Sequence, residues 1–167
     1  MKGENSLVLY LDFDGVLHHE NCVWHPRRGA YLVAPERYTL FQHSALLEKM
    51  LAPYPAVQIV LSTSWVRRYG MSATAKRLPA SLQERVIGAT FHSRHMQDDE
   101  FMYLHRGQQV HNDALRRKPQ DWVALDDDGQ GWPAEHAARF VQTHPYEGLS
   151  DPSVQYDFRK RLEKMCK

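Results

Sequence analysis

The feature that most constrains the fold is an unbroken apolar run that ends in acidic residues. Leu7–Leu11 (LVLYL) leads directly into Asp12, Phe13, Asp14 and Gly15. Five consecutive apolar residues are typical of a strand that is buried on both faces inside a parallel sheet. In open α/β sheets, ligands bind in the crevice beyond the carboxyl ends of the strands. We therefore interpret Asp12 and Asp14 as residues of a functional site.

Two later apolar runs also end in polar side chains. Val57–Leu61 leads into Ser-Thr-Ser at 62–64, and Trp122–Leu125 leads into three Asp residues at 126–128. Hydroxyl residues in such a run are typical of a helix cap, and a helix N-terminus also binds anions. Three adjacent carboxylates repel one another unless a cation neutralises them. Because parallel strands end at one edge of a sheet, we expect these groups to meet the first two carboxylates.

The rest of the chain alternates between helical and strand patterns. The stretch from Phe91 to Tyr103 shows no pattern. The alternation, with connections of βαβ length, predicts a three-layer α/β/α Rossmann-like domain with a central, mainly parallel sheet. We expect one domain over residues 1–167. Helices are predicted over 42–52, 71–78, 81–85, 107–117 and from Ser150 or Asp151 onward, and short strands around 86–90 and 139–143.

Composition narrows the class of protein. The chain is 43% hydrophobic and 25% charged, as in ordinary globular proteins, and its net charge of +1 argues against a strongly basic nucleic-acid binder. Cys22 and Cys166 form no CxxC pair, which indicates free thiols in a reducing compartment. No apolar run reaches membrane-spanning length, and MKGENS does not resemble a signal peptide. We expect a cytoplasmic protein with no membrane partner.

The side chains that end the strands suit phosphoryl transfer. Mg²⁺ binds through one or two carboxylates together with substrate phosphate. One carboxylate can attack phosphorus and form an aspartyl-phosphate, and a second can protonate the leaving group and then activate water. Hydroxyl groups and the ammonium of Lys118, just before the third strand, would hold the phosphoryl oxygens.

The order of these motifs resembles that of the haloacid dehalogenase (HAD) superfamily of phosphohydrolases. DFDGVL is similar to the first motif of the family, and IVLSTSW, Lys118 and VALDD follow in the family's order between Leu7 and Asp128. An acidic pair that comes last, rather than first, argues against a phosphorylation-dependent receiver domain. The chain also resembles small bacterial HAD proteins with little or no cap, some of them related to nucleic-acid repair phosphatases.

The resemblance implies a role for each matching residue. Asp12 would be the nucleophile and a Mg²⁺ ligand, and Asp14 would be the general acid and base while offering its backbone carbonyl to the metal. Asp126 would complete the metal site, with Asp127 as a further ligand or as support. Lys118 would neutralise the nucleophile and the phosphoryl group.

Two assignments stay open at this point. Gly15 permits the turn after the strand, but either Ser62 or Thr63 could be the hydroxyl that contacts phosphate. We prefer Thr63 because a small residue, Ser64, follows it. For the third motif, the alternatives to Lys118 are Arg116 and Arg117.

Substrate choice in this family usually depends on the cap, and here the segment between the first two motifs is short. We expect residues 18–40 to form either a flap over the site or a plain surface loop, with a short hairpin near Ala30–Val33. Between Arg67 and Lys118 there are ten Lys or Arg and five Asp or Glu, which would attract a polyanion or simply form a solvated face. For the aromatic residues, core packing is favoured over stacking on a nucleobase; these are Trp24, Tyr31, Trp65 and Trp132.

The leading hypothesis is thus a Mg²⁺-dependent phosphoric monoester hydrolase. Small phosphomonoesters, nucleotides and nucleic-acid termini all stay open as substrates. The alternative is a non-catalytic HAD-like module that binds phosphate or nucleic acid.

Overall fold

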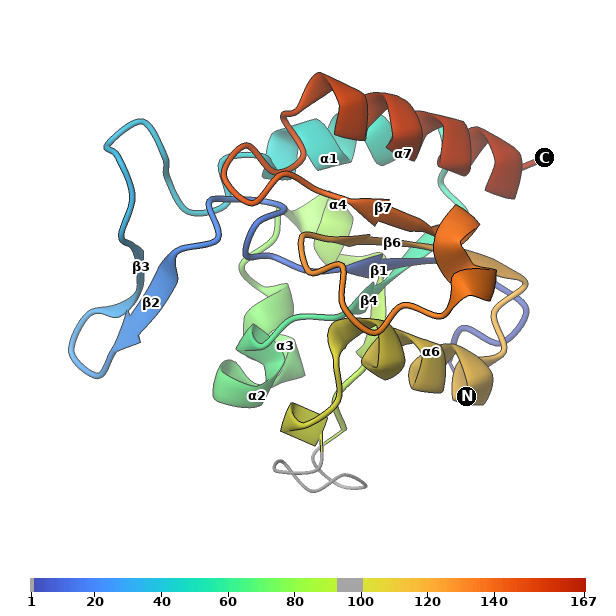
Figure 1. The fold of residues 1–167 in the computed structure, drawn as a ribbon, viewed down its shortest axis with the longest axis horizontal. Helices are drawn as coiled ribbons and strands as arrows, with labels where there is room; N and C mark the ends of the chain where they lie inside the picture. The colour runs from blue at the N-terminus through green and yellow to red at the C-terminus, as the bar shows by residue number, and fades with distance from the viewer. Residues whose placement is uncertain (1, 93–100) are drawn as a thin grey trace.

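A sheet of five parallel strands forms the centre of the protein (Figure 1). The computed structural model describes residues 2–92 and 101–167, so part of the patternless stretch from Phe91 to Tyr103 lies outside the described residues. The strand order is β5-β4-β1-β6-β7. The strands are β1 (Leu7–Leu11), β4 (Val57–Leu61), β5 (Val86–Ala89), β6 (Asp121–Asp126) and β7 (Phe140–Gln142). The predicted parallel sheet is confirmed.

Helices cover both faces of this sheet. In Figure 1, α1 (Ser44–Leu51) and α7 (Pro152–Met165) lie along one face and α6 (Arg106–Arg117) lies along the other. Successive side chains of β1 enter two different apolar clusters, and Leu9 and Tyr10 illustrate the alternation. This explains why the run is apolar at every position, and it confirms the three-layer α/β/α architecture.

Shorter helices connect these layers. α3 (Met71–Ala75) covers the first part of the helix predicted over 71–78, and α4 (Ala80–Gln83) begins one residue before the helix predicted over 81–85. α2 (Trp65–Tyr69) precedes α3 and lies outside the predicted helices. A 3₁₀ helix, η1 (Ala134–Arg139), precedes β7. Among the described residues, none of the helices has both the length and the apolar character that crossing a bilayer requires.

The register of the central strands aligns their last residues. Leu11 of β1 pairs with Leu61 of β4 and with Leu125 of β6. The next residues, Asp12 and Ser62, therefore stand level with the end of β6 at the carboxyl edge of the sheet. The backbone continues the alignment, because the Asp12 N–H donates to the Leu125 carbonyl at 3.1 Å and the Ser62 N–H donates to the Leu11 carbonyl at 2.8 Å.

A two-stranded hairpin follows the first strand. β2 (Cys22–His25) and β3 (Gly29–Leu32) pair antiparallel and project beyond the main sheet (Figure 1). The predicted hairpin near Ala30–Val33 is confirmed. Cys22 in this hairpin and Cys166 near the far end of the chain are both free thiols.

Candidate active site

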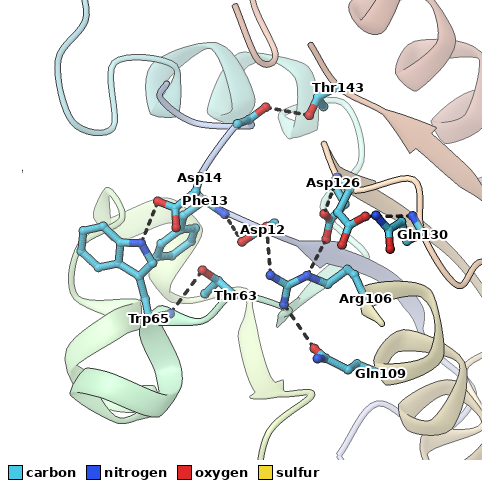
Figure 2. A network of polar contacts seen from close by, with 12 residues as sticks. Asp12, Phe13, Asp14, Thr63, Trp65, Arg106, Gln109, Asp126, Gln130 and Thr143 are labelled. Carbon is cyan, nitrogen blue, oxygen red and sulfur yellow. Dashed lines mark hydrogen bonds and ion pairs between the residues drawn. The ribbon is translucent and has the colours of Figure 1, made fainter. Parts of the chain in front are cut away.

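The carboxyl edge of the sheet gathers polar side chains from three neighbouring strands. Asp12 follows β1, Thr63 follows β4 and Asp126 ends β6. All three residues are at least 97% buried. Figure 2 shows them around one centre, with Arg106 reaching in from α6. The sequence-based expectation that these strand ends converge is therefore met by the geometry.

Asp12 occupies the middle of the group. Its Oδ1 accepts a 2.7 Å hydrogen bond from the Phe13 N–H, and its Oδ2 accepts one of 3.3 Å from Arg106. The Thr63 hydroxyl also hydrogen-bonds to this carboxylate. Burial raises the pKa of Asp12 to about 6, although Arg106 acts in the opposite direction. The Asp12 carboxylate is therefore desolvated, and hydrogen bonds to both of its oxygens fix its orientation.

Asp126 and Asp127 bring two further carboxylates to Asp12. One oxygen from each of the three groups lies within 4.8 Å of the others. Burial and the Asp12 charge raise the pKa of Asp127 to about 7 and that of Asp126 well above its ordinary value. Like charges this close disfavour ionisation unless a cation is present.

Gly15 makes this approach possible. Its φ of +69° lies in the left-handed region, and a Cβ at this position would stand 2.4 Å from Cγ of Asp127. Any side chain at Gly15 would therefore displace Asp127 as well as strain the turn. Glycine is therefore required at position 15 for two reasons: the predicted tight turn and the close approach of the Asp127 side chain.

The cation of the site is Arg106, the first residue of α6. Its Nε lies 3.1 Å from Oδ2 of Asp126, and its terminal nitrogen lies 3.3 Å from Oδ2 of Asp12. A third contact runs from Arg106 to the Gln109 side chain at 3.2 Å. The guanidinium thus bridges the two buried carboxylates. Its several N–H donors allow this, whereas the ammonium of a lysine offers a single charged nitrogen.

The structure does not bring Lys118 to this site, and the expectation that it lies beside Asp12 is wrong. α6 runs antiparallel to the strands, so its first residue lies at the carboxyl edge and its last residues lie at the opposite edge. Lys118 is exposed after the end of α6, and its carbonyl accepts from the Asn5 N–H just before β1. The alternatives Arg116 and Arg117 both pair with Asp113 instead. The predicted helix over 107–117 leads into the strand that ends in Asp126, so the start of this helix must lie near the carboxyl edge of the sheet. That argument from topology would have pointed to Arg106.

Asp14 is held beside Asp12 by two ring N–H groups. Its Oδ1 accepts from Nε1 of Trp65 at 3.0 Å and lies 2.9 Å from Nε2 of His18. Because Nδ1 of the fully buried His18 accepts from the Phe41 N–H, the proton of a neutral His18 ring lies on Nε2 and points at Asp14. The Asp14 side chain keeps 27% of its surface exposed. It is therefore oriented yet open to a reactant.

The three hydroxyls after β4 separate in space. Thr63 contacts Asp12 and accepts from the Trp65 N–H at 3.5 Å. The buried Ser62 hydroxyl has no hydrogen-bond partner among the described residues, and Ser64 is exposed at the start of α2. Thr63 is the hydroxyl that touches the central carboxylate, while Ser62 keeps an unused donor.

The donor set fits a hard divalent cation. Three carboxylates face one guanidinium, and Oδ2 of the buried Asp126 makes an ion pair but no hydrogen bond among the described residues. Clustered carboxylate oxygens are the ligands that Mg²⁺ and Ca²⁺ prefer. The residues that could hold such an ion are Asp12, Asp126 and Asp127.

Comparison with known proteins gives one finding about the family. A family model described as the HAD domain in Swiss Army Knife RNA repair proteins matches residues 8–154. No curated protein and no solved structure matches the chain. The matched range runs from β1 into α7, so it contains every residue of the site described above.

Proposed function

Because the chain belongs to the HAD superfamily of phosphohydrolases, in the family of HAD domains from Swiss Army Knife RNA repair proteins, we propose that it hydrolyses a phosphoric monoester in a Mg²⁺-dependent reaction through an aspartyl-phosphate. The observation that carries this proposal is the meeting of three carboxylates from two strands within 4.8 Å, beside Arg106, which bridges two of them. Acidic residues that serve only to keep a surface soluble stay exposed, whereas Asp12 and Asp126 are buried.

In the first step, an oxygen of Asp12 attacks the phosphorus atom and the bond from phosphorus to the leaving oxygen breaks. Asp14, entering as the carboxylic acid, donates its proton to that leaving oxygen. In the second step, Asp14 takes a proton from water as the water oxygen attacks phosphorus. The Asp12–phosphorus bond then breaks, which releases inorganic phosphate and restores both carboxyl groups.

Other groups assist these steps by position and charge. Arg106 bridges Asp12 and Asp126 and would offset the charge that accumulates on the phosphoryl oxygens. Thr63 or Ser62 would donate to one of those oxygens. A Mg²⁺ ion held by the side chains of Asp12, Asp126 and Asp127 and by the Asp14 carbonyl would supply the remaining positive charge.

We further propose that the substrate is the phosphorylated end of a nucleic acid. The matching family is that of HAD domains in RNA repair proteins, which supports this choice. The alternative, a non-catalytic module that binds phosphate or nucleic acid, would not need the oriented and partly exposed Asp14.

The direct test is hydrolysis of an aryl phosphate with and without Mg²⁺. Asp12→Asn should reduce the rate on the order of 10⁴-fold or more, because it removes the nucleophile. Asp157→Asn, an exposed carboxylate on α7, is the matched control and should keep wild-type activity. Circular dichroism checks that both variants fold.

Two results would count against the proposal. Equal activity in Asp12→Asn would remove Asp12 as the nucleophile. A wild-type protein that hydrolyses neither aryl phosphates nor phosphorylated oligonucleotides in the presence of Mg²⁺ would favour the binding module.

A further inference from the structure

A pocket of about 220 Å³ opens directly beside Asp14. One wall comes from the β2–β3 hairpin, which contributes Cys22 and Trp24. The facing wall comes from α2, which contributes Trp65, Arg68 and Tyr69. The pocket therefore adjoins Asp14, the proposed proton donor. Its walls are the segment that follows β1 in the chain and the segment that follows β4.

The proposed reaction fixes which part of a substrate would occupy this space. The leaving oxygen departs on the side of phosphorus opposite Asp12 and takes its proton from Asp14. Figure 2 shows Asp14 and Trp65 on one side of Asp12, and Arg106 and Asp126 on the other. The group attached to the leaving oxygen must then extend past Asp14, which is the direction of the pocket.

The pocket offers an exposed aromatic face and a cation together. Trp24 is 41% exposed, and the Arg68 guanidinium lies 4.1 Å from the centre of its ring. Trp65, by contrast, is only 4% exposed and packs edge to face against Phe13 and Phe41. Trp24 is thus available to a ligand, whereas Trp65 belongs to the core and uses its N–H to hold Asp14.

The two walls also share one sign of charge. Residues 21–35, which contain the hairpin, and residues 62–83, which contain α2, together carry six Lys or Arg and no Asp or Glu. The whole chain has a net charge of only +1. The two segments that form the walls are therefore more positive than the chain as a whole, and Arg68 brings one of these charges into the pocket lining, where it would attract a phosphate.

We propose that this pocket holds the terminal nucleoside of a single-stranded oligoribonucleotide whose end phosphate lies at Asp12, with its base against Trp24 and its next phosphate paired with Arg68. This proposal rests on the proposed function, because the position of the leaving group follows from the roles of Asp12 and Asp14. Stacking on an exposed aromatic ring together with a neighbouring cation is the common basis of single-strand binding.

Binding can be measured without catalysis. In the Asp12→Asn background, with Mg²⁺ present, fluorescence anisotropy would report the Kd of a five-nucleotide oligoribonucleotide that carries a 3′- or 5′-phosphate and a dye at the other end. Adding Trp24→Ala should weaken binding about 5- to 150-fold, the effect of losing one stacked base. Trp24→Phe should restore most of the affinity, since it keeps an aromatic face. Arg68→Ala should weaken binding and make it less sensitive to salt.

The chain offers a matched control pair on α7. Tyr156 is 56% exposed and Lys160 lies 4.4 Å from the centre of its ring, so this pair repeats the aromatic–cation contact away from the pocket. Tyr156→Ala and Lys160→Ala should leave the Kd unchanged. In the otherwise wild-type protein, Trp24→Ala should lower the ratio of kcat/KM for the oligonucleotide to kcat/KM for acetyl phosphate by about 5-fold or more.

The outcomes separate this inference from the proposed function. If Trp24→Ala and Arg68→Ala bind the oligonucleotide as tightly as the α7 controls, the pocket assignment is wrong even if the wild-type protein hydrolyses phosphoesters. If the wild-type protein hydrolyses none but binding still depends on Trp24, the reaction is wrong and the pocket assignment stands. Melting temperatures check that each variant is folded.

Discussion

Two buried groups of acidic residues in this protein differ in how their charge is balanced. At the carboxyl edge of the sheet, Asp12, Asp126 and Asp127 lie together, and Arg106 pairs with the first two of them. On the far half of α6, Asp113 alone receives three hydrogen bonds from Arg116 and Arg117 and a fourth from a tyrosine hydroxyl. Among the described residues, the three carboxylates at the carboxyl edge have one guanidinium as a partner, whereas the single carboxylate of Asp113 has two.

Asp121 at the start of β6 belongs with the balanced kind. It lies 2.6 Å from a nitrogen of Arg161 and 3.1 Å from Nε of Arg139. Although burial acts in the opposite direction, hydrogen bonds led by the one from Arg161 lower the pKa of Asp121. At the carboxyl edge the pKa values are raised instead. We expect the fully paired acids to stabilise the fold and the crowded acids at the carboxyl edge to hold a cation.

A large expected effect on catalysis tests which cation belongs to the unbalanced group. Arg106→Gln should lower kcat/KM for an aryl phosphate about 10²- to 10³-fold, because it removes the preorganised positive charge next to the nucleophile. Lys118→Gln is the matched control and should leave kcat/KM unchanged. The reverse pattern would restore Lys118 as the third-motif residue.

A stability effect should mark the balanced group. Arg117 is 1% exposed, and Asp113, its partner, is fully buried. Arg117→Ala should lower the free energy of unfolding by about 3–5 kcal/mol, because it leaves a buried carboxylate without its main partner. Urea unfolding measures the change, and Arg159→Ala on the exposed side of α7 should change it by less than about 0.5 kcal/mol. Similar values for the two variants would show that the Asp113 pair is not structural.

Magnesium should stabilise the protein through the unbalanced group alone. At a concentration 100 times its Kd, a ligand that binds only the folded state adds about 2.7 kcal/mol to the free energy of unfolding. The melting temperature should therefore rise with Mg²⁺ in the wild type and in Asp121→Asn, but not in Asp126→Asn. A Mg²⁺-dependent rise that survives in Asp126→Asn would place the ion elsewhere.

A further expected effect is a difference in how stability depends on pH. The pKa of Asp127 rises from its ordinary value of 3.8 to about 7 in the folded protein, so within that window the folded state keeps a proton that the unfolded state has lost. In metal-free protein this carboxyl therefore makes stability fall as the pH rises through the window. Urea unfolding in EDTA should show a weaker fall in Asp127→Asn.

Asp121 should act with the opposite sign. Its pKa is lowered on folding, so its contribution to stability is present above the ordinary value of 3.8 and is lost as the pH falls through the lowered value. Asp121→Asn should therefore reduce the loss of stability at acid pH. Above about pH 5, the change of the free energy of unfolding with pH should stay nearly the same as in the wild type. Equal pH profiles for Asp121→Asn and Asp127→Asn would contradict the division into two kinds of acidic group.

The strand-borne half of the site could be predicted from the sequence. Apolar runs over 7–11, 57–61 and 122–125 identify buried parallel strands, and the residues that follow each run must meet at one edge. The runs alone place Asp12, Asp126 and the pair Ser62 and Thr63 at this edge, and no knowledge of packing is needed, although they do not choose between the two hydroxyls.

The helix-borne half could not be predicted by the same reasoning. Arg106 begins a helix after a stretch without periodicity, and a single arginine carries no pattern of its own. Choosing Lys118 relied on nearness in sequence to the acidic strand, whereas a helix that returns antiparallel puts its other end at the site. The exposure of Trp24 likewise depends on where the hairpin projects, which hydropathy does not encode.

The position of α6 has a consequence for the spacing within it. Arg106 and Asp113 are seven residues apart, nearly two full turns, so both side chains leave the helix on the same side. Asp113 accepts from the Tyr10 hydroxyl of β1, and Arg117 donates to the Lys2 carbonyl, so these two contacts outside the helix hold its rotation about its own axis. That rotation aims Arg106 at Asp12. Deleting one residue between 106 and 113 would turn one side chain by about 100° relative to the other. The helix could then no longer place Arg106 at Asp12 and Asp113 at Tyr10 at the same time.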